Sequence, residues 1–174
     1  TATVAGSAAD LVEALTPSAT AKDALTLTVT GTATAAELKA LDAKTSVAVD
    51  ASGVTEITGT ATELKTVLAA NTAATPTITL DLTAVNLTVD GKVSAADLNA
   101  FAKATDGVVT ADIEGSAAAL NAALKDVDKT VDDITVTLTG TSATAKDLIE
   151  LTAKVSTLDV SSLRTITGDL TDIN

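Results

Sequence analysis

The sequence predicts an α/β fold, a right-handed α/β solenoid with parallel strands on one face and short helices on the other. The first observation behind this prediction is a repeated unit. A glycine ends a Thr/Val-rich run, a Ser, Thr or Asp follows as a helix N-cap, and Leu or Ile comes four residues after the cap. A fixed period of this size is typical of stacked arrays, whose units bury their apolar faces against their neighbours. The unit occurs six times and begins a seventh time, with cap and apolar residue at Ser7/Leu11, Thr34/Leu38, Thr60/Leu64, Ser94/Leu98, Ser116/Leu120, Thr144/Leu148 and Asp169/Ile173.

The second observation is that these units, which we call coils, alternate between a short and a long kind. In short coils the cap directly follows the glycine, as Ser7 follows Gly6, whereas in long coils it comes later, as Thr34 follows Gly31. A second apolar residue follows the first at four residues in short coils and at three in long coils, and both spacings place the pair on one helix face. The pairs are Leu11/Leu15, Leu64/Leu68 and Leu120/Leu124 in short coils, and Leu38/Leu41, Leu98/Phe101 and Leu148/Leu151 in long coils.

The third observation is that strand signals separate the helices. Alternating runs of β-branched residues predict strands, and strands that alternate with helices at short intervals must run parallel. A strand signal also opens the chain at Thr1–Ala5. The predicted strands between the helices are Leu25–Val29, Ser46–Ala51, Thr77–Leu82, Val108–Ile113, Ile134–Leu138 and Thr157–Val160.

Each helix begins with a recognisable cap. Thr34 with Glu37 and Thr60 with Glu63 have the spacing of a capping box, in which the hydroxyl accepts from an orphan amide and the carboxylate reaches back. Ser7, Ser94 and Thr144 are followed by Asp at the same spacing, whereas Ser116 has Ala119 there.

The chain is predicted to be a single array over residues 1–174. Residues 4–34 align without a gap with residues 113–143 at an offset of 109 residues, which spans two short–long pairs, as tandem duplication would leave them. Because arrays end in polar capping units, we expect this array to be a segment of a longer chain.

Composition excludes several functional classes. A net charge of −12 argues against nucleic acid as a partner, since such binding needs a basic surface, and it argues equally against binding to anionic membranes. No apolar run approaches the roughly 18 residues of a membrane span, so we expect no membrane insertion. His, Cys and Tyr are absent, which removes the commonest catalytic bases, nucleophiles and metal ligands, and we expect no enzymatic activity and no catalytic residues.

The remaining carboxylates have a structural interpretation. Asp50, Asp81 and Asp159 occupy similar places in their coils, each followed two residues later by Ser or Thr. We therefore predict a series of turn hydrogen bonds rather than a catalytic carboxylate pair.

One segment partly resembles the calcium loop of dockerins and EF-hands. In residues 86–98, Asp90 and Gly91 would be loop positions five and six, and Asp97 would be position twelve. Asn86 and Thr88 replace the usual acidic residues at the start of the loop. Asn86, Asp90 and Asp97 are thus the calcium candidates, and no other cofactor is expected.

The repeats resemble the Ala/Thr/Asp-rich repeats of very large bacterial surface proteins, among them surface-layer proteins, adhesins and type I-secreted proteins of marine cyanobacteria. The resemblance rests on Gly31-Thr-Ala-Thr-Ala-Ala-Glu-Leu, Gly59-Thr-Ala-Thr-Glu-Leu-Lys and the segment Val49–Thr58 between them. It implies an exported, extracellular protein at the bacterial cell surface. The calcium-binding nonapeptides of many such proteins are absent, and the Asn-bearing consensus of leucine-rich repeats, an analogue in architecture only, is absent too.

Two functions follow as hypotheses. The first is a structural repeat region of a surface layer, surface filament or adhesin, acting through self-association, flanking repeats of the same protein or cell-surface polysaccharide. The alternative is an extracellular binding module whose Thr-rich strand face recognises a glycan or a repeating surface such as ice. Thr26, Thr28 and Thr30 would share one strand face, as would Thr135, Thr137 and Thr139.

Overall fold

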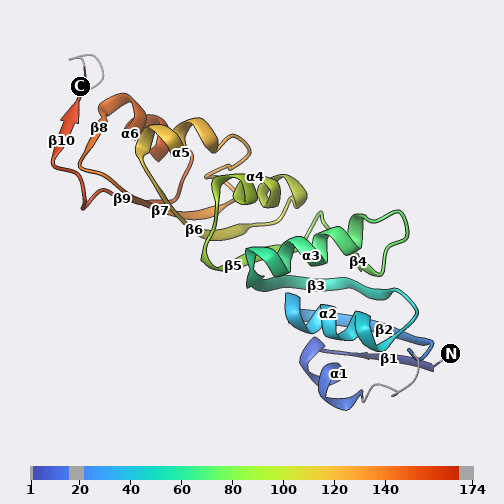
Figure 1. Cartoon of the computed structure of the whole chain (residues 1–174). Coiled ribbons are helices and arrows are strands. Elements are labelled where there is room, and N and C mark those ends of the chain that lie inside the picture. Colours follow the sequence, from blue (N-terminus) through green and yellow to red (C-terminus); the bar gives the residue numbers. More distant parts are fainter. Residues whose placement is uncertain (1, 16–21, 169–174) are drawn as a thin grey trace. The chain divides into compact units, whose positions relative to one another are not determined.

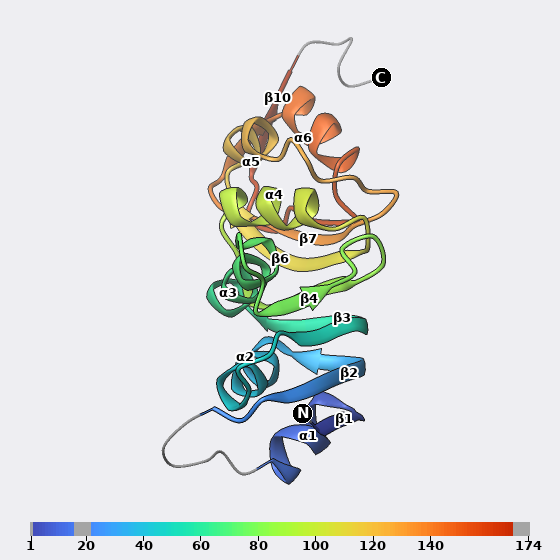
Figure 2. The ribbon, with the colours of Figure 1, turned by 90° about the vertical axis from the view of Figure 1, so that its right-hand side faces the viewer.

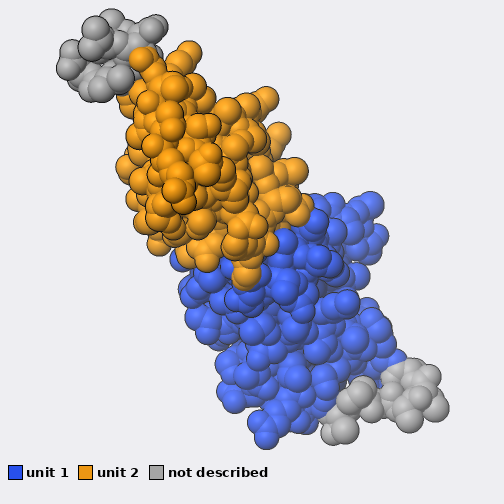
Figure 3. Space-filling view, turned by 60° about the vertical axis from the view of Figure 1, so that its left-hand side comes forward, with its two compact units in different colours: residues 1–90 blue, residues 91–174 orange. Residues whose placement is uncertain are grey.

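Along the described chain, one or two strands precede each helix (Figure 1). The structure is a computed structural model, and it describes residues 2–15 and 22–168. Its contacts divide the chain into two compact units, residues 1–90 and residues 91–174 (Figure 3). The seventh helix start predicted at Asp169/Ile173 lies outside the described residues.

The first unit is a parallel sheet covered by helices. Its strands pair in the order β1-β2-β3-β5, and β4 pairs with the first part of β3. The helices α1, α2 and α3 lie side by side on one face of this sheet (Figure 2). The elements are β1 (Ala2–Gly6), α1 (Ala8–Ala14), β2 (Leu25–Thr34), α2 (Ala35–Lys44), β3 (Val49–Thr60), α3 (Ala61–Thr72), β4 (Ile78–Leu80) and β5 (Asn86–Lys92).

The second unit repeats this plan. Strands β6, β7 and β9 pair in parallel, and β8 pairs in parallel with β10. The predicted α/β class with a mostly parallel sheet is thereby confirmed. Among the described residues, none of the helices combines the length and the apolar character needed to cross a bilayer. The elements are α4 (Ala95–Ala104), β6 (Val109–Gly115), α5 (Ala117–Ala123), β7 (Asp133–Leu138), β8 (Ser142–Thr144), α6 (Ala145–Thr152), β9 (Thr157–Asp159) and β10 (Thr165–Thr167).

The core of each unit lies between the sheet and the helices. Strand side chains alternate, so that Leu27 and Val29 of β2 are buried while Thr26 and Thr28 are half-buried on the opposite face. The core is built from Val, Leu, Ile and Ala, with Phe101 of α4 as its aromatic residue.

The predicted helix anchors are buried in most coils but not in all. The pairs Leu38/Leu41, Leu98/Phe101 and Leu120/Leu124 are buried as expected. The prediction for α3 was wrong in its second residue, because Val67 is buried there and Leu68 is only half-buried. The two buried residues of α3, Leu64 and Val67, are therefore three positions apart, as in the long coils. Leu15 and Leu148 are also only half-buried.

The predicted N-caps are confirmed in every described helix. Thr34 and Thr60 form complete capping boxes with Glu37 and Glu63. Where Asp replaces Glu, the side chain is one methylene shorter. In α1 and α6 the carboxylate accepts from the cap hydroxyl in place of the cap amide, as Asp10 does from Ser7 at 2.7 Å. The remaining caps, Ser94 and Ser116, accept from the amide three residues on.

The short and long coils differ in the backbone of their glycines. The glycines of the long coils have φ values of 84° at Gly31, 76° at Gly91 and 97° at Gly140, in the left-handed region that side chains disfavour. Two of the short-coil glycines, Gly59 and Gly115, instead leave room for a side chain of a helix, whereas a Cβ at Gly6 would make ordinary contact. A Cβ at Gly115 would lie 3.0 Å from Leu120 Cγ. The two glycine-to-cap spacings predicted from the sequence are thus accompanied by different backbone conformations at the glycine.

Two strands extend well beyond their predicted bounds, whereas β4 and β9 are shorter than predicted. β2 continues through Gly31 to the cap at Thr34, and β3 continues through Gly53 to Thr60. β5 was not among the predicted strand ranges, although Leu87 and Val89 continue a strand pattern in the sequence. It pairs with the second half of β3 from Glu56↔Asn86 to Thr60↔Asp90. Its Asp90-Gly91 sequence favours a turn locally, and the pairing with β3 overrides that preference.

Candidate functional site

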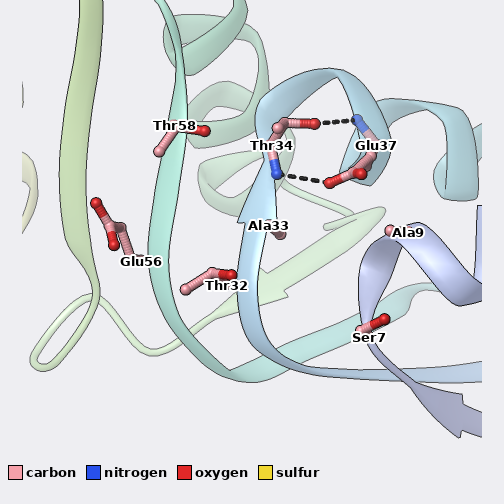
Figure 4. Close-up of a pocket in the computed structure, with 8 residues that line it drawn as sticks. All are labelled: Ser7, Ala9, Thr32, Ala33, Thr34, Glu37, Glu56 and Thr58. Atoms are coloured by element: carbon pink, nitrogen blue, oxygen red, sulfur yellow. Dashed lines mark hydrogen bonds between the residues drawn. The ribbon is translucent and has the colours of Figure 1, made fainter.

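A hollow of about 450 Å³ lies in the first unit where α1 and α2 begin (Figure 4). Hydroxyl groups, small Ala side chains and two carboxylates surround it. β2 and β3 supply part of its wall, and the first turns of the two helices supply the rest. The lining residues are Ser7, Ala9, Thr32, Ala33, Thr34, Glu37, Glu56 and Thr58.

The second unit has the equivalent hollow, of about 250 Å³, where α5 and α6 begin. Ser7 and Thr58 of the first hollow correspond at the offset of 109 residues to Ser116 and Thr167 of the second. Counted from the helix cap, which lies one residue further on in the second unit, Ala33, Thr34 and Glu37 correspond to Ala143, Thr144 and Asp147. Its lining is completed by Ala117, Ala118 and Ser142. The repeat thus preserves the place of the hollow and its hydroxyl-rich lining, whereas the second hollow has one carboxylate, Asp147, where the first has two.

The carboxylates of the first hollow are bonded within the protein. Glu37 Oε2 accepts from the Thr34 amide at 2.8 Å, and the Glu37 amide donates to Thr34 Oγ1 at 3.1 Å (Figure 4). Glu56 Oε1 accepts from the Thr88 hydroxyl at 2.8 Å. These acids fix a helix end and link two strands, as expected of a scaffold.

A second repeated feature is a turn with the pattern Asp-x-Ser/Thr. Asp81 Oδ1 accepts from both the amide and the hydroxyl of Thr83, at 3.0 and 2.6 Å. Asp50 does the same with Ser52, and Asp159 accepts from the Ser161 amide. The turn bonds predicted at Asp50, Asp81 and Asp159 are therefore confirmed. Sequence reasoning missed a fourth turn, Asp128 with Thr130, although it carries the same pattern.

The turns lower the pKa of three carboxyl groups below the ordinary value of 3.8. For Asp81 the Thr83 hydroxyl contributes most and the Thr83 amide next. For Asp128 and Asp159 the amide two residues on contributes most and the hydroxyl of that residue next. Each bond favours the charged form of the group that accepts it.

We predict an acid-sensitive contribution to stability from these turns. Since each pKa is depressed in the folded state, the contribution is present above pH 3.8 and is lost as the pH falls below 3.8 toward the folded values. The triple variant Asp81→Asn, Asp128→Asn, Asp159→Asn keeps the turn-forming side chains without the titration. Urea unfolding at about pH 5 and about pH 2.5 should show a smaller acid loss in the variant than in the wild type. Equal losses would contradict the assignment.

An acidic hollow of about 280 Å³ in the second unit also has a structural explanation. Asp132, at 5% exposure, accepts from the Val109 amide through Oδ1 at 3.1 Å and from the Asp128 amide through Oδ2 at 2.9 Å. Its carboxylate thus joins the start of β6 to the turn before β7. The lining also includes Asp106 and Asp126.

Lysine side chains connect neighbouring coils through backbone carbonyls at the C-terminal ends of helices. Lys22 Nζ donates to Asp42 O at 2.8 Å, and Lys129, two residues before the position that corresponds to Lys22 in the repeat, makes the analogous bond to Thr152 O at 3.0 Å. Lys44 donates to Leu15 O, and its equivalent Lys154 donates to Asn121 O. A cation at these positions satisfies orphan carbonyls and interacts favourably with the helix dipole.

The three calcium candidates do not come together in one loop. Asn86 and Asp90 lie on the single extended strand β5, four residues or about 13 Å apart along it, and Asp97 lies in the first turn of α4. Calcium ligands lie about 2.4 Å from the ion, so Asn86 and Asp90 cannot share one. Over the described ranges, no cluster of three or more acidic side chains has a metal-binding arrangement.

The outer face of the sheet mixes threonine with acids. Thr28 pairs with Asp50 across β2 and β3. In the second unit, Thr135 lies between Asp112 and Thr157, and Thr137 lies between Glu114 and Asp159 in the strand register. The threonines share the predicted face, but carboxylates interrupt them, so the face is not a uniform threonine array. The two sets are Thr26, Thr28 and Thr30, and Thr135, Thr137 and Thr139.

The chain matches no protein-family model, no curated protein and no solved structure. Function is therefore inferred from the contacts described above.

Proposed function

We propose that this chain is a structural repeat region of an exported bacterial surface-layer, surface-filament or adhesin protein. Its coils would form one right-handed α/β solenoid, the hand expected for parallel strands joined by crossover helices. In a linear array each coil contacts only its neighbours, so the array can be divided between any two coils. Two compact units are therefore compatible with a single array.

The observation that carries this proposal is the duplication of contacts that hold the backbone. Lys22 and Lys129 each donate to a carbonyl near the end of the next helix, although they lie two residues apart in the repeat alignment. Lys44 and Lys154 each donate to a carbonyl near the end of the preceding helix. The caps at Thr34 and Thr144 repeat in the same way. A duplication that keeps scaffolding contacts is expected when length and regularity are the selected properties.

Charge and composition support an exposed role outside the cell. A net charge of −12 keeps a long repetitive chain soluble and disfavours non-specific association. Acidic surfaces also meet millimolar divalent cations outside the cell, and calcium bridging between chains is part of the proposal. Partners would be further repeats of the same protein or cell-surface polysaccharide.

Immunolabelling of intact cells tests the location. Antibodies raised against the folded chain should label the surface of unpermeabilised cells of the source bacterium, and external protease should remove that signal. A cytoplasmic protein serves as the control for cell integrity, because antibodies against it should label the cells only after permeabilisation. Signal found after permeabilisation alone would contradict the proposal.

A second candidate function, glycan binding, is favoured by the two equivalent hollows and the hydroxyl-rich sheet face. Hydroxyl and carboxylate groups can hydrogen-bond to sugar hydroxyls, although the chain has no Trp or Tyr on which a sugar ring could stack. A polysaccharide that protects the hollow-lining residues in hydrogen exchange would favour this function over a purely structural one.

A further inference from the structure

Four positions on β9, β10 and the segment between them are more exposed than their buried repeat equivalents. Val49, Ala51, Val54 and Ile57 of β3 are 0%, 0%, 2% and 0% exposed. At the offset of 109 residues the corresponding side chains are Leu158, Val160, Leu163 and Ile166. Val160 is 44% exposed and Ile166 is 56% exposed, while Leu158 and Leu163 are half-buried. We call these four residues the C-terminal apolar edge.

The first unit shows what covers this position in the repeat. Val49 pairs with Ile78 and Ala51 pairs with Leu80, both on β4, while Ile57 pairs with Leu87 on β5. The covering element is thus the strand segment of a long coil, with aliphatic residues opposite three of the four inward positions.

The adjoining helix differs in the same sense. Leu38 of α2 is fully buried, whereas its equivalent Leu148 of α6 is only half-buried. Next to it, Ile149 is 56% exposed where α2 has Lys39. Leu148 is therefore less covered than Leu38, whereas Ile149 occupies a position that is exposed in both helices.

We propose that the C-terminal apolar edge is a docking surface for a further long coil of the same repeat type, supplied by a flanking repeat. The proposal rests on the proposed function, since it names the partner through which the array is extended. The N-terminal coil of a second copy fits less well, because it is of the short kind, with Ser7 directly after Gly6. Placed on the edge, it would put two short coils together and break the alternation.

The test adds the missing coil to the full chain. Asn174 corresponds to Lys65, so a second copy of residues 66–107 attached after Asn174 continues the repeat in phase. The control extension carries Asp in place of the appended copies of Ile78 and Leu87. Because the chain has no cysteine, Ile166→Cys introduces a unique thiol whose reaction with a maleimide reports its exposure.

The intact extension should slow labelling at position 166 at least about tenfold, whereas the control extension should leave it fast. Ser161→Cys is the matched control, since Ser161 and its equivalent Ser52 are both exposed and labelling there should not change. If the Ile166→Cys variant does not fold, hydrogen exchange of residues 158–166 can be measured in chains without cysteine. Exchange there should be slower with the intact extension than with the control extension.

Fast labelling at position 166 with the intact extension would overturn the proposal. Protection without any extension that increases with protein concentration would overturn it in favour of a second copy. Surface labelling of cells remains a separate result, so failure of docking is distinguishable from failure of the proposed function.

Discussion

Replacing Leu64 by Ala is expected to lower the free energy of unfolding by about 2–4 kcal/mol. Leu64 is 1% exposed in α3 and packs into the layer between helices and sheet. Truncation removes buried methyl groups and leaves a cavity that a rigid layer fills poorly. Urea unfolding followed by circular dichroism measures the loss.

Two variants of the same helix define the buried face. Thr66 is exposed and its hydroxyl bonds only to Thr62 O, so Thr66→Ala should change stability by no more than about 0.5 kcal/mol. Leu68→Ala should cost less than Leu64→Ala because Leu68 is half-buried. Equal losses at Leu64 and Leu68 would show that the helix face is wrongly assigned.

Asp132→Ala is the second substitution with a large expected effect, a loss of about 1–3 kcal/mol. Removal of the carboxylate leaves the Val109 amide at the start of β6 without its acceptor, in a buried place. It also removes the acceptor for the Asp128 amide. The unpaired donors then carry an uncompensated desolvation cost.

The neighbouring residue supplies the control. Asp133 is exposed at the start of β7, so Asp133→Ala removes the same charge from the same place in the sequence. Its effect on urea unfolding should be within about 0.5 kcal/mol. If both variants lose the same free energy, net charge rather than the buried hydrogen bonds explains the loss at Asp132.

Local features could be predicted from the sequence. The caps at Thr34 and Thr60 depend on bonds three residues apart, and the turns at Asp50 and Asp81 depend on bonds two residues apart. Both partners of each bond therefore lie within a few residues of sequence, so their spacing alone predicts the bond. The α/β class followed because the helix and strand patterns alternate without overlap.

Features that depend on distant segments could not be predicted. Whether Val67 or Leu68 turns inward depends on the rotation of α3 against the sheet, which its own sequence does not determine. The bond from the Val109 amide to Asp132 spans 23 residues. The two hollows depend on the separation of adjacent coils. The exposure of Ile166 became informative only when compared with its buried equivalent Ile57.

Deletion of one complete short–long pair tests the array most directly. Removal of residues 59–114 joins Thr58 to Gly115, which takes the place of Gly59 in the repeat. Because each coil is expected to contact only its neighbours, the shortened chain should fold with unchanged ellipticity per residue. Its urea m-value should be about two-thirds of the wild-type value, in proportion to the residues that remain.

An off-period deletion of residues 59–100 provides the matched control, since it joins β3 to the middle of α4 and should not fold. Circular dichroism and cooperative urea unfolding of the two deletions decide the matter. If the chain is an array of coils, deletion of residues 59–114 should give a cooperative transition and deletion of residues 59–100 should not. Loss of folded structure in that deletion, to the same extent as in the off-period control, would show that the chain has one indivisible core rather than an array of coils.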